Sequence, residues 1–128
     1  MMMNIDIAQL EGAIDDLKNL LKDGLLAADI WDAETGLSLA GYNAQPAAVA
    51  LFTQVTADLG SALSNSGFPS LSRYYLLDLD GHATVMVIRH GDNLLQGMLL
   101  NNQRANLGLL LSVALPRMLD RVSKARVG

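Results

Sequence analysis

Three segments of this chain are apolar at consecutive positions, although the turns between them predict an antiparallel sheet. Leucines are adjacent at positions 25–26 and 99–100, and residues 85–88 (VMVI) are apolar throughout. Antiparallel strands with one wet face alternate between apolar and polar residues. Both faces of this sheet must therefore be covered, and the rest of the sequence has to supply that cover.

Two helices are predicted in the first half of the chain. Apolar residues recur at helical spacing over residues 7–21, and charged residues occupy the opposite face. Pro46 suits the first turn of a second helix, which runs to about Asn65. These two segments are long enough to cover part of a sheet.

A final helix is expected from about residue 103 to residue 124. Asn101 or Asn102 suits its N-cap. Pro116 lies inside the segment, and we expect it to kink the helix or to leave a backbone carbonyl unpaired. The last turns contain several basic residues, which suit the negative end of the helix dipole.

Strand and turn patterns complete an α+β fold with the order α-β-β-α-β-β-β-α. The five expected strands span residues 25–31, 37–42, 73–79, 83–89 and 94–100. Asp80 and Gly81 form a strong hairpin signal between two of them. We expect a five-stranded antiparallel sheet with the second helix on one face and the first and last helices on the other. Residues 1–128 then form a single domain.

The second helix is poor in charge for a surface helix. Asp58 is its only charged residue between Pro46 and Ser64, and only 17% of the whole chain is charged. We expect a sheet-facing stripe of Ala48, Phe52, Val55, Leu59 and Leu63. A second stripe is small or uncharged and predicts a contact with a second copy of the chain: Ala47, Ala50, Gln54, Ala57 and Ser61. The alternative is an ordinary alanine-rich surface helix.

The third strand predicts the same self-association. It follows a crossover and is expected at one sheet edge, while the alternating residues 37–42 suit the other edge. An apolar open edge invites pairing with another chain, and pairing across a twofold axis would remove it. The interface residues expected here are Arg73, Tyr74, Tyr75 and Leu77. A tyrosine buried in the core of its own subunit is the alternative for either aromatic residue.

No constellation of residues predicts catalysis, a cofactor or a metal. The chain has no cysteine and no glycine-rich phosphate loop. His82 and His90 lie at the two ends of one predicted strand, about 26 Å apart, and are expected in turns. Asp78 and Asp80 precede a glycine turn, where aspartates normally accept backbone hydrogen bonds. We therefore expect a protein that is not an enzyme.

Net charge and hydropathy restrict the classes of partner that we expect for this chain. The net charge is −4 and the basic residues form no broad cluster, so nucleic acid is not expected as a partner. The apolar run at residues 107–116 is about half the ~20 residues that a membrane-spanning helix needs. No targeting segment is recognisable at the start. We expect a cytoplasmic protein that does not insert into membranes.

Three stretches together resemble the roadblock family, named after a dynein light chain and widespread in bacteria and archaea. They are residues 25–41 with Asp32 and Gly36 in the turn, residues 74–100, and residues 101–108 (NNQRANLG). Longin and profilin-like domains have the same elements and remain alternatives. The resemblance implies a homodimer through the second helix and third strand, with one sheet continuous across both subunits.

The resemblance also implies a function. Bacterial and archaeal members of the family often regulate small Ras-like GTPases, some as GTPase-activating partners, and others are passive subunits of assemblies. Our leading hypothesis is a homodimeric platform that regulates or anchors such a GTPase. The alternatives are a structural scaffold subunit without a GTPase link, and a small-ligand sensory domain. A buried pocket with converging polar groups would favour the last.

Overall fold

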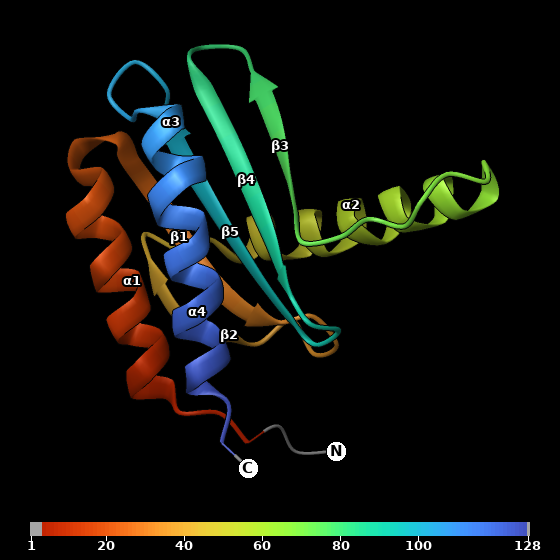
Figure 1. Ribbon diagram of the computed structural model, residues 1–128, viewed down its shortest axis with the longest axis horizontal. Coiled ribbons are helices and arrows are strands. Elements are labelled where there is room, and N and C mark those ends of the chain that lie inside the picture. The colour runs from red at the N-terminus through yellow and green to blue at the C-terminus, as the bar shows by residue number, and fades with distance from the viewer. Residues whose placement is uncertain (1–3, 128) are drawn as a thin grey trace.

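Helices α1 (Ile7–Leu21) and α4 (Leu115–Ala125) lie side by side on one face of a five-stranded sheet, and α2 (Pro46–Asn65) crosses the other face (Figure 1). The computed structural model describes residues 4–127. Its strands are β1 (Leu25–Asp32), β2 (Ser38–Tyr42), β3 (Tyr74–Leu79), β4 (Ala83–His90) and β5 (Leu94–Asn101). The predicted α+β class, its element order and its layers are confirmed.

The sheet order is β2-β1-β5-β4-β3, and every neighbouring pair is antiparallel. Strands β2 and β3 are the two edges, as the sequence predicts. Hairpins join β3 to β4 and β4 to β5, and their turns contain Gly81 and Gly91 at φ values of 76° and 69°. Only glycine adopts this left-handed region without a steric cost. The crossover through α2 carries the chain from one sheet edge to the other.

The face under α1 and α4 contains most of the core. Twenty-one buried residues form one cluster there, drawn from both helices, four strands and the segment between β5 and α4. Helix α1 starts at its N-cap Asp6, whose side chain accepts a hydrogen bond from the Gln9 amide. Its predicted apolar stripe is buried, except for Ile7 in the first turn. Helical periodicity therefore predicted four of the five buried residues of α1.

The start of the last helix was predicted too early. Asn101 and Asn102 do not cap it, because Asn101 ends β5 and its side chain accepts a bond from the Gln103 amide within a turn. The helix begins with α3 (Leu107–Leu109), where Asn106 accepts a hydrogen bond from Leu109. An asparagine cap was expected, but the one in use lies four or five residues further along the chain.

A π-helical turn at Leu110–Ala114 joins α3 to α4, immediately before Pro116. A proline inside a regular helix clashes with the carbonyl four residues earlier. The wider turn moves hydrogen bonding from four to five residues at this point, since the Leu115 amide donates to the Leu110 carbonyl. The predicted disturbance by Pro116 therefore takes the form of a local π turn.

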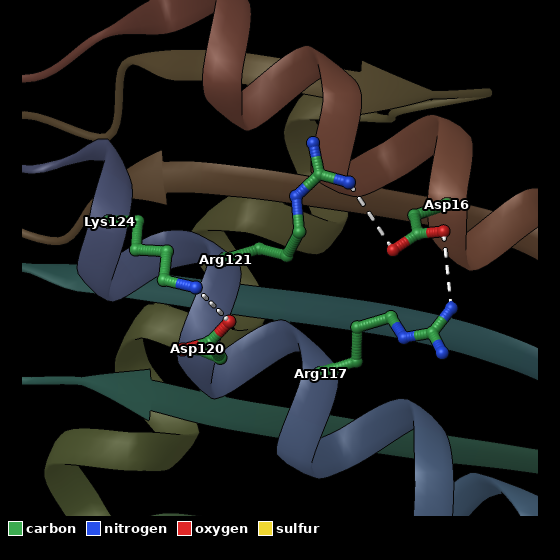
Figure 2. A network of polar contacts seen from close by, with 5 residues as sticks. All are labelled: Asp16, Arg117, Asp120, Arg121 and Lys124. Atoms are coloured by element: carbon green, nitrogen blue, oxygen red, sulfur yellow. Dashed lines mark hydrogen bonds and ion pairs between the residues drawn. The ribbon is translucent and has the colours of Figure 1, made fainter.

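Ion pairs join the outer surfaces of α1 and α4 (Figure 2). Asp16 lies 3.4 Å from Arg117 Nη1 and 3.3 Å from Arg121 Nη1. A side chain at Gly12 would meet the Arg121 guanidinium at 2.5 Å, so the glycine lets that arginine lie across α1. Within α4, Lys124 pairs with Asp120 at 3.0 Å. The two helices are thus held by polar contacts outside and apolar contacts inside.

Candidate functional site

Helix α2 is almost unburied in the isolated subunit. Of its 20 residues only Val49 is buried, and Figure 1 shows its C-terminal half projecting past the sheet. The helix begins with Pro46 in its first turn and ends at Asn65, as predicted. A helix of this length with one buried residue has most of its surface free for another molecule.

The predicted sheet-facing stripe of α2 is correct at Phe52 but incomplete. Val49, Thr53 and Thr56 also face the sheet, Ala48 is exposed but lines the cavity beside the sheet, and Val55, Leu59 and Leu63 are partly covered. Neither predicted stripe included these two threonines. Each hydroxyl donates to a carbonyl four residues earlier in the helix and meets an aromatic residue of the sheet.

Those two threonines position α2. The Trp31 indole Nε1 donates to Thr53 Oγ1 at 2.9 Å, and the hydroxyls of Thr56 and Tyr75 lie 2.8 Å apart. Burial raises the pKa of Tyr75, against the opposing effect of its bond to Thr56. Both contacts come from positions that helical hydropathy alone ranks as surface.

The structure places the nine predicted interface residues in two groups. Seven are exposed: Ala47, Ala50, Gln54, Ala57, Ser61, Arg73 and Tyr74. The other two, Tyr75 and Leu77, are partly buried and pack into the small core beneath α2. Their side chains therefore serve the subunit's own fold, which was the alternative reading for a tyrosine of this strand.

Sequence reasoning missed several large apolar residues that the structure leaves exposed near α2 and β3. Leu51 is 54% exposed and Phe68, just after the helix, is 68% exposed. Leu76 and Leu79 of β3 are also exposed. Leu51 belongs to neither predicted stripe. Its apolar character on a helix with so little charge was the signal available in the sequence.

The outer edge of β3 has free backbone groups. The Arg89 amide donates to the Arg73 carbonyl at 2.7 Å, so Arg73 turns its backbone toward β4. Because backbone direction alternates along a strand, Tyr74, Leu76 and Asp78 turn theirs away from the sheet. The core under α1 and α4 includes no buried residue of β3. The outward backbone groups of this edge therefore face no neighbouring strand, and its side chains are not buried in that core.

A cavity of about 130 Å³ lies between the N-terminal half of α2 and the sheet. Asp29 of β1 lines it and is only 7% exposed. Its Oδ1 accepts a 2.6 Å hydrogen bond from the Ser38 hydroxyl, while its Oδ2 has no partner among residues 4–127. Burial raises the pKa of this carboxyl group, opposed by the bond from Ser38.

The two histidines have different environments. His82 lies in a turn, as predicted, with φ of 60°. His90 was also expected in a turn, but it is the buried last residue of β4, and its Nε2 lies 2.8 Å from Gln96 Oε1. Burial, with the Arg126 charge nearby, lowers the pKa of His90 to about 4. Over residues 4–127, no three acidic or histidine side chains are grouped as metal ligands.

Neither a protein-family model nor a curated sequence matches the chain, but solved structures do. Myxococcus xanthus MglB superposes with a TM-score of 0.76 at 10% identity, covering 100% of this chain and 98% of that one. A Roadblock/LC7 domain from Streptomyces avermitilis gives 0.62 at 16% identity, over 89% and 92%. The chain has the roadblock fold. A Schizosaccharomyces pombe profilin is less similar, with a TM-score of 0.55 at 10% identity over 89% and 94%.

Three features of this roadblock fold are candidates for contact with another molecule. They are the outer surface of α2, the open edge of β3, and the cavity beside Asp29. In the part of the chain that the structure describes, no helix is both long and apolar enough to cross a bilayer.

Proposed function

We propose that the chain forms a homodimer through α2 and β3, and that this dimer regulates or anchors a small Ras-like GTPase. The observation that carries the proposal is α2 itself, a 20-residue helix with one buried residue and one charged residue, beside an open strand edge. Regulation, with GTPase activation as one form of it, or simple anchoring both fit such a platform. The protein would act in the cytoplasm and would not itself be an enzyme.

The surface of α2 is suited to close contact with a second helix. Ala47, Ala50 and Ala57 are exposed and small, which lets two helix axes approach closely. Leu51 adds a large apolar side chain that is half exposed in the single subunit. Depletion of charge is typical of the centre of protein interfaces, because charged groups are costly to desolvate. These properties favour a second copy over solvent.

Strand β3 supports the same dimer from the side of the sheet. Pairing it with its own copy would satisfy the outward backbone groups of Tyr74, Leu76 and Asp78. A twofold axis there also brings the two α2 helices together, because each projects past this edge (Figure 1). One solved MglB structure aligns with 96% of this chain at 17% identity and is described as having a tetrameric arrangement. This description supports self-association in this fold.

The GTPase partner is inferred from the roadblock resemblance and from what the chain lacks. Its sequence contains no phosphate-binding loop, so a nucleotide-dependent role requires a partner that holds the nucleotide. A twofold platform of paired helices presents a broad surface of low charge to such a partner. The alternative is a scaffold subunit that uses the same platform without a GTPase.

The dimer is tested first, by light scattering on the purified chain. We expect a mass about twice the 13.7 kDa of one chain. Ala57→Glu and Ala50→Glu should yield monomers with unchanged circular dichroism, because each places a charge on the contact face. A monomeric wild type, or charged variants that remain dimers, would overturn the interface.

Proline substitutions test the β3 edge separately. Leu76→Pro removes only an outward amide and should weaken the dimer while preserving the fold. Leu77→Pro is the matched control, since it removes an amide that bonds to β4 and should destabilise the subunit itself. If Leu76→Pro dimerises like the wild type, β3 is not part of the interface.

The partner is tested with the purified wild-type chain as bait in an extract of its source cells, loaded with a GTP analogue or GDP. We expect a Ras-like GTPase to be captured more strongly in one nucleotide state, and Ala57→Glu to capture less of it. The GTP hydrolysis rate of that GTPase, measured with and without this protein, separates activation from anchoring. Capture without a GTPase, or without nucleotide dependence, would support the scaffold alternative instead.

A further inference from the structure

The cavity beneath the first half of α2 is lined almost entirely by apolar groups. The larger apolar residues of the lining include Trp31, Val49, Phe52 and Leu99, and its polar residues are Asp29, Asn43 and Gln45. Gly97 lies against the Trp31 ring, where an added Cβ would be only 3.1 Å from the ring atoms. The volume, about 130 Å³, is close to the ~150 Å³ of an apolar protein cavity that binds benzene.

The one acidic side chain in this lining is not fully paired. Asp29 is only 7% exposed. Only one of its two carboxylate oxygens has a hydrogen-bond partner within residues 4–127. A Cβ added at Gly41 of β2 would lie 3.3 Å from Asp29 Oδ1, so β2 covers that side of the carboxylate. The free oxygen, Oδ2, belongs to the residue that lines the cavity.

A buried carboxylate with an unsatisfied oxygen is destabilising unless something binds it. Leaving one buried polar group unpaired costs about 1–3 kcal/mol, and more for a charged group. An apolar residue at position 29 would avoid that cost. The Ser38 hydroxyl of β2 accounts for Oδ1, but Oδ2 has no such partner within residues 4–127. A ligand that donates a hydrogen bond to Oδ2 would remove this cost.

We propose that this cavity binds a small primary amine, with an apolar body against Trp31 and Phe52 and an ammonium group that donates to Asp29 Oδ2. A charged donor suits a carboxylate better than a neutral one, since charge-assisted hydrogen bonds are about twice as strong. The volume suits a branched alkyl or single-ring body of roughly six non-hydrogen atoms. The site is independent of the dimer proposed above and does not require a GTPase.

Trp31 is the chain's only tryptophan and lines the site, so its fluorescence reports occupancy directly. The probe is isopentylamine, and the neutral control is isopentanol, which has the same carbon skeleton. We expect a saturable change in Trp31 emission, with an apparent Kd about tenfold lower for the amine than for the alcohol. No saturable change with the amine, or equal affinities for both compounds, would overturn the proposal.

Two matched pairs of variants locate the binding. Asp29→Asn should bring the two affinities close together, whereas Asp58→Asn, the same change at an exposed position of α2, should leave the tenfold preference intact. Ala48→Phe should weaken binding of both probes by filling the cavity mouth, whereas Ala62→Phe on the same helix should not. An unchanged preference in folded Asp29→Asn, or full binding by Ala48→Phe, would place the probe elsewhere.

Light scattering on the same samples keeps this test separate from the dimer. A monomeric chain that still binds isopentylamine through Asp29 would contradict the dimer alone. A dimeric chain without saturable binding would contradict the amine site alone.

Discussion

The two faces of the sheet are covered by helices in very different ways. Under α1 and α4, 21 buried residues form one core cluster, whereas the cluster beneath α2 contains five. Helix α1 buries five of its 15 residues and α2 one of its 20. The first layer is buried within one subunit, whereas the second leaves most of its helix exposed. In our proposal, stability and binding therefore belong to opposite faces of the sheet.

The sequence composition of the helices explains the difference. Helix α1 has an apolar stripe with charges on its other side, and Asp16 anchors it to the two arginines of α4 (Figure 2). Helix α2 has alanine, serine and threonine where a core helix would carry leucine. Its sheet contacts are one valine, one phenylalanine and two threonine hydroxyls. Because α2 is attached to the sheet by few contacts, much of its surface is available to a partner.

Truncating one leucine on each face gives the largest expected contrast. Leu17→Ala should lower the free energy of unfolding by about 2–5 kcal/mol, because Leu17 is fully buried under α1. Leu51→Ala should change it by no more than about 0.5 kcal/mol in the monomer, because Leu51 is 54% exposed. Urea denaturation followed by circular dichroism measures both.

The state of assembly has to be controlled in that comparison. Both leucine variants are best measured in the Ala57→Glu background, where dimer formation does not contribute to stability. In the wild-type background, a greater loss for Leu51→Ala at higher protein concentration would show that this side chain acts through the dimer. A loss in the monomer as large as that of Leu17→Ala would contradict the contrast between the faces.

The second contrast between the two faces concerns how folding stability changes at acid pH. His90, on the α1 and α4 face, has a pKa of about 4 in the folded chain instead of its ordinary 6.5. The unfolded chain therefore binds more protons between these pH values, and stability falls as the pH falls through that window. The full loss is roughly 3 kcal/mol, since one pKa unit corresponds to about 1.4 kcal/mol. Urea titrations from pH 7 to pH 4 measure it.

Carboxylates also titrate in this range, so a variant without the imidazole is needed. His90→Gln should show a shallower loss of stability between pH 6.5 and pH 4 than the wild type. Equal slopes for the two proteins would show that His90 charges without cost in the folded chain. Asp29, on the other face, has a raised pKa and acts in the opposite direction, because its folded form holds its proton to higher pH.

The same difference between the two faces determines how much of each could be predicted from the sequence. The α1 layer, both sheet edges and the roadblock order follow from periodicity, because burial under α1 is set by side-chain hydrophobicity. Beneath α2, Thr53 and Thr56 bury hydroxyls that bond to the helix's own backbone, and hydropathy cannot show this. Asp29 lies within an apolar strand, where only the three-dimensional arrangement reveals its free oxygen. The partner that we propose for α2 is a separate molecule, so no pattern within one chain identifies it.

A smaller effect is expected at the polar attachment of α2. Thr53→Val keeps the shape of the side chain but leaves the buried Trp31 indole N–H without its 2.9 Å partner. An unpaired buried donor costs about 1–3 kcal/mol. Thr53→Ser retains the hydroxyl and should lose less. The measurement is thermal unfolding followed by Trp31 fluorescence, and equal loss in both variants would assign the effect to packing of the methyl group.

The smallest expected effect lies in the ion pairs that join α1 to α4. Asp16→Asn removes the charge that faces Arg117 and Arg121, but all three side chains are partly exposed, so solvent screens the attraction. We expect a loss of no more than about 1 kcal/mol, and less in high salt. Asp120→Asn, which breaks only the exposed pair with Lys124, is the matched control and should lose still less. A loss for Asp16→Asn as large as that of Leu17→Ala, unaffected by salt, would mean that charge and not the apolar core holds this face together.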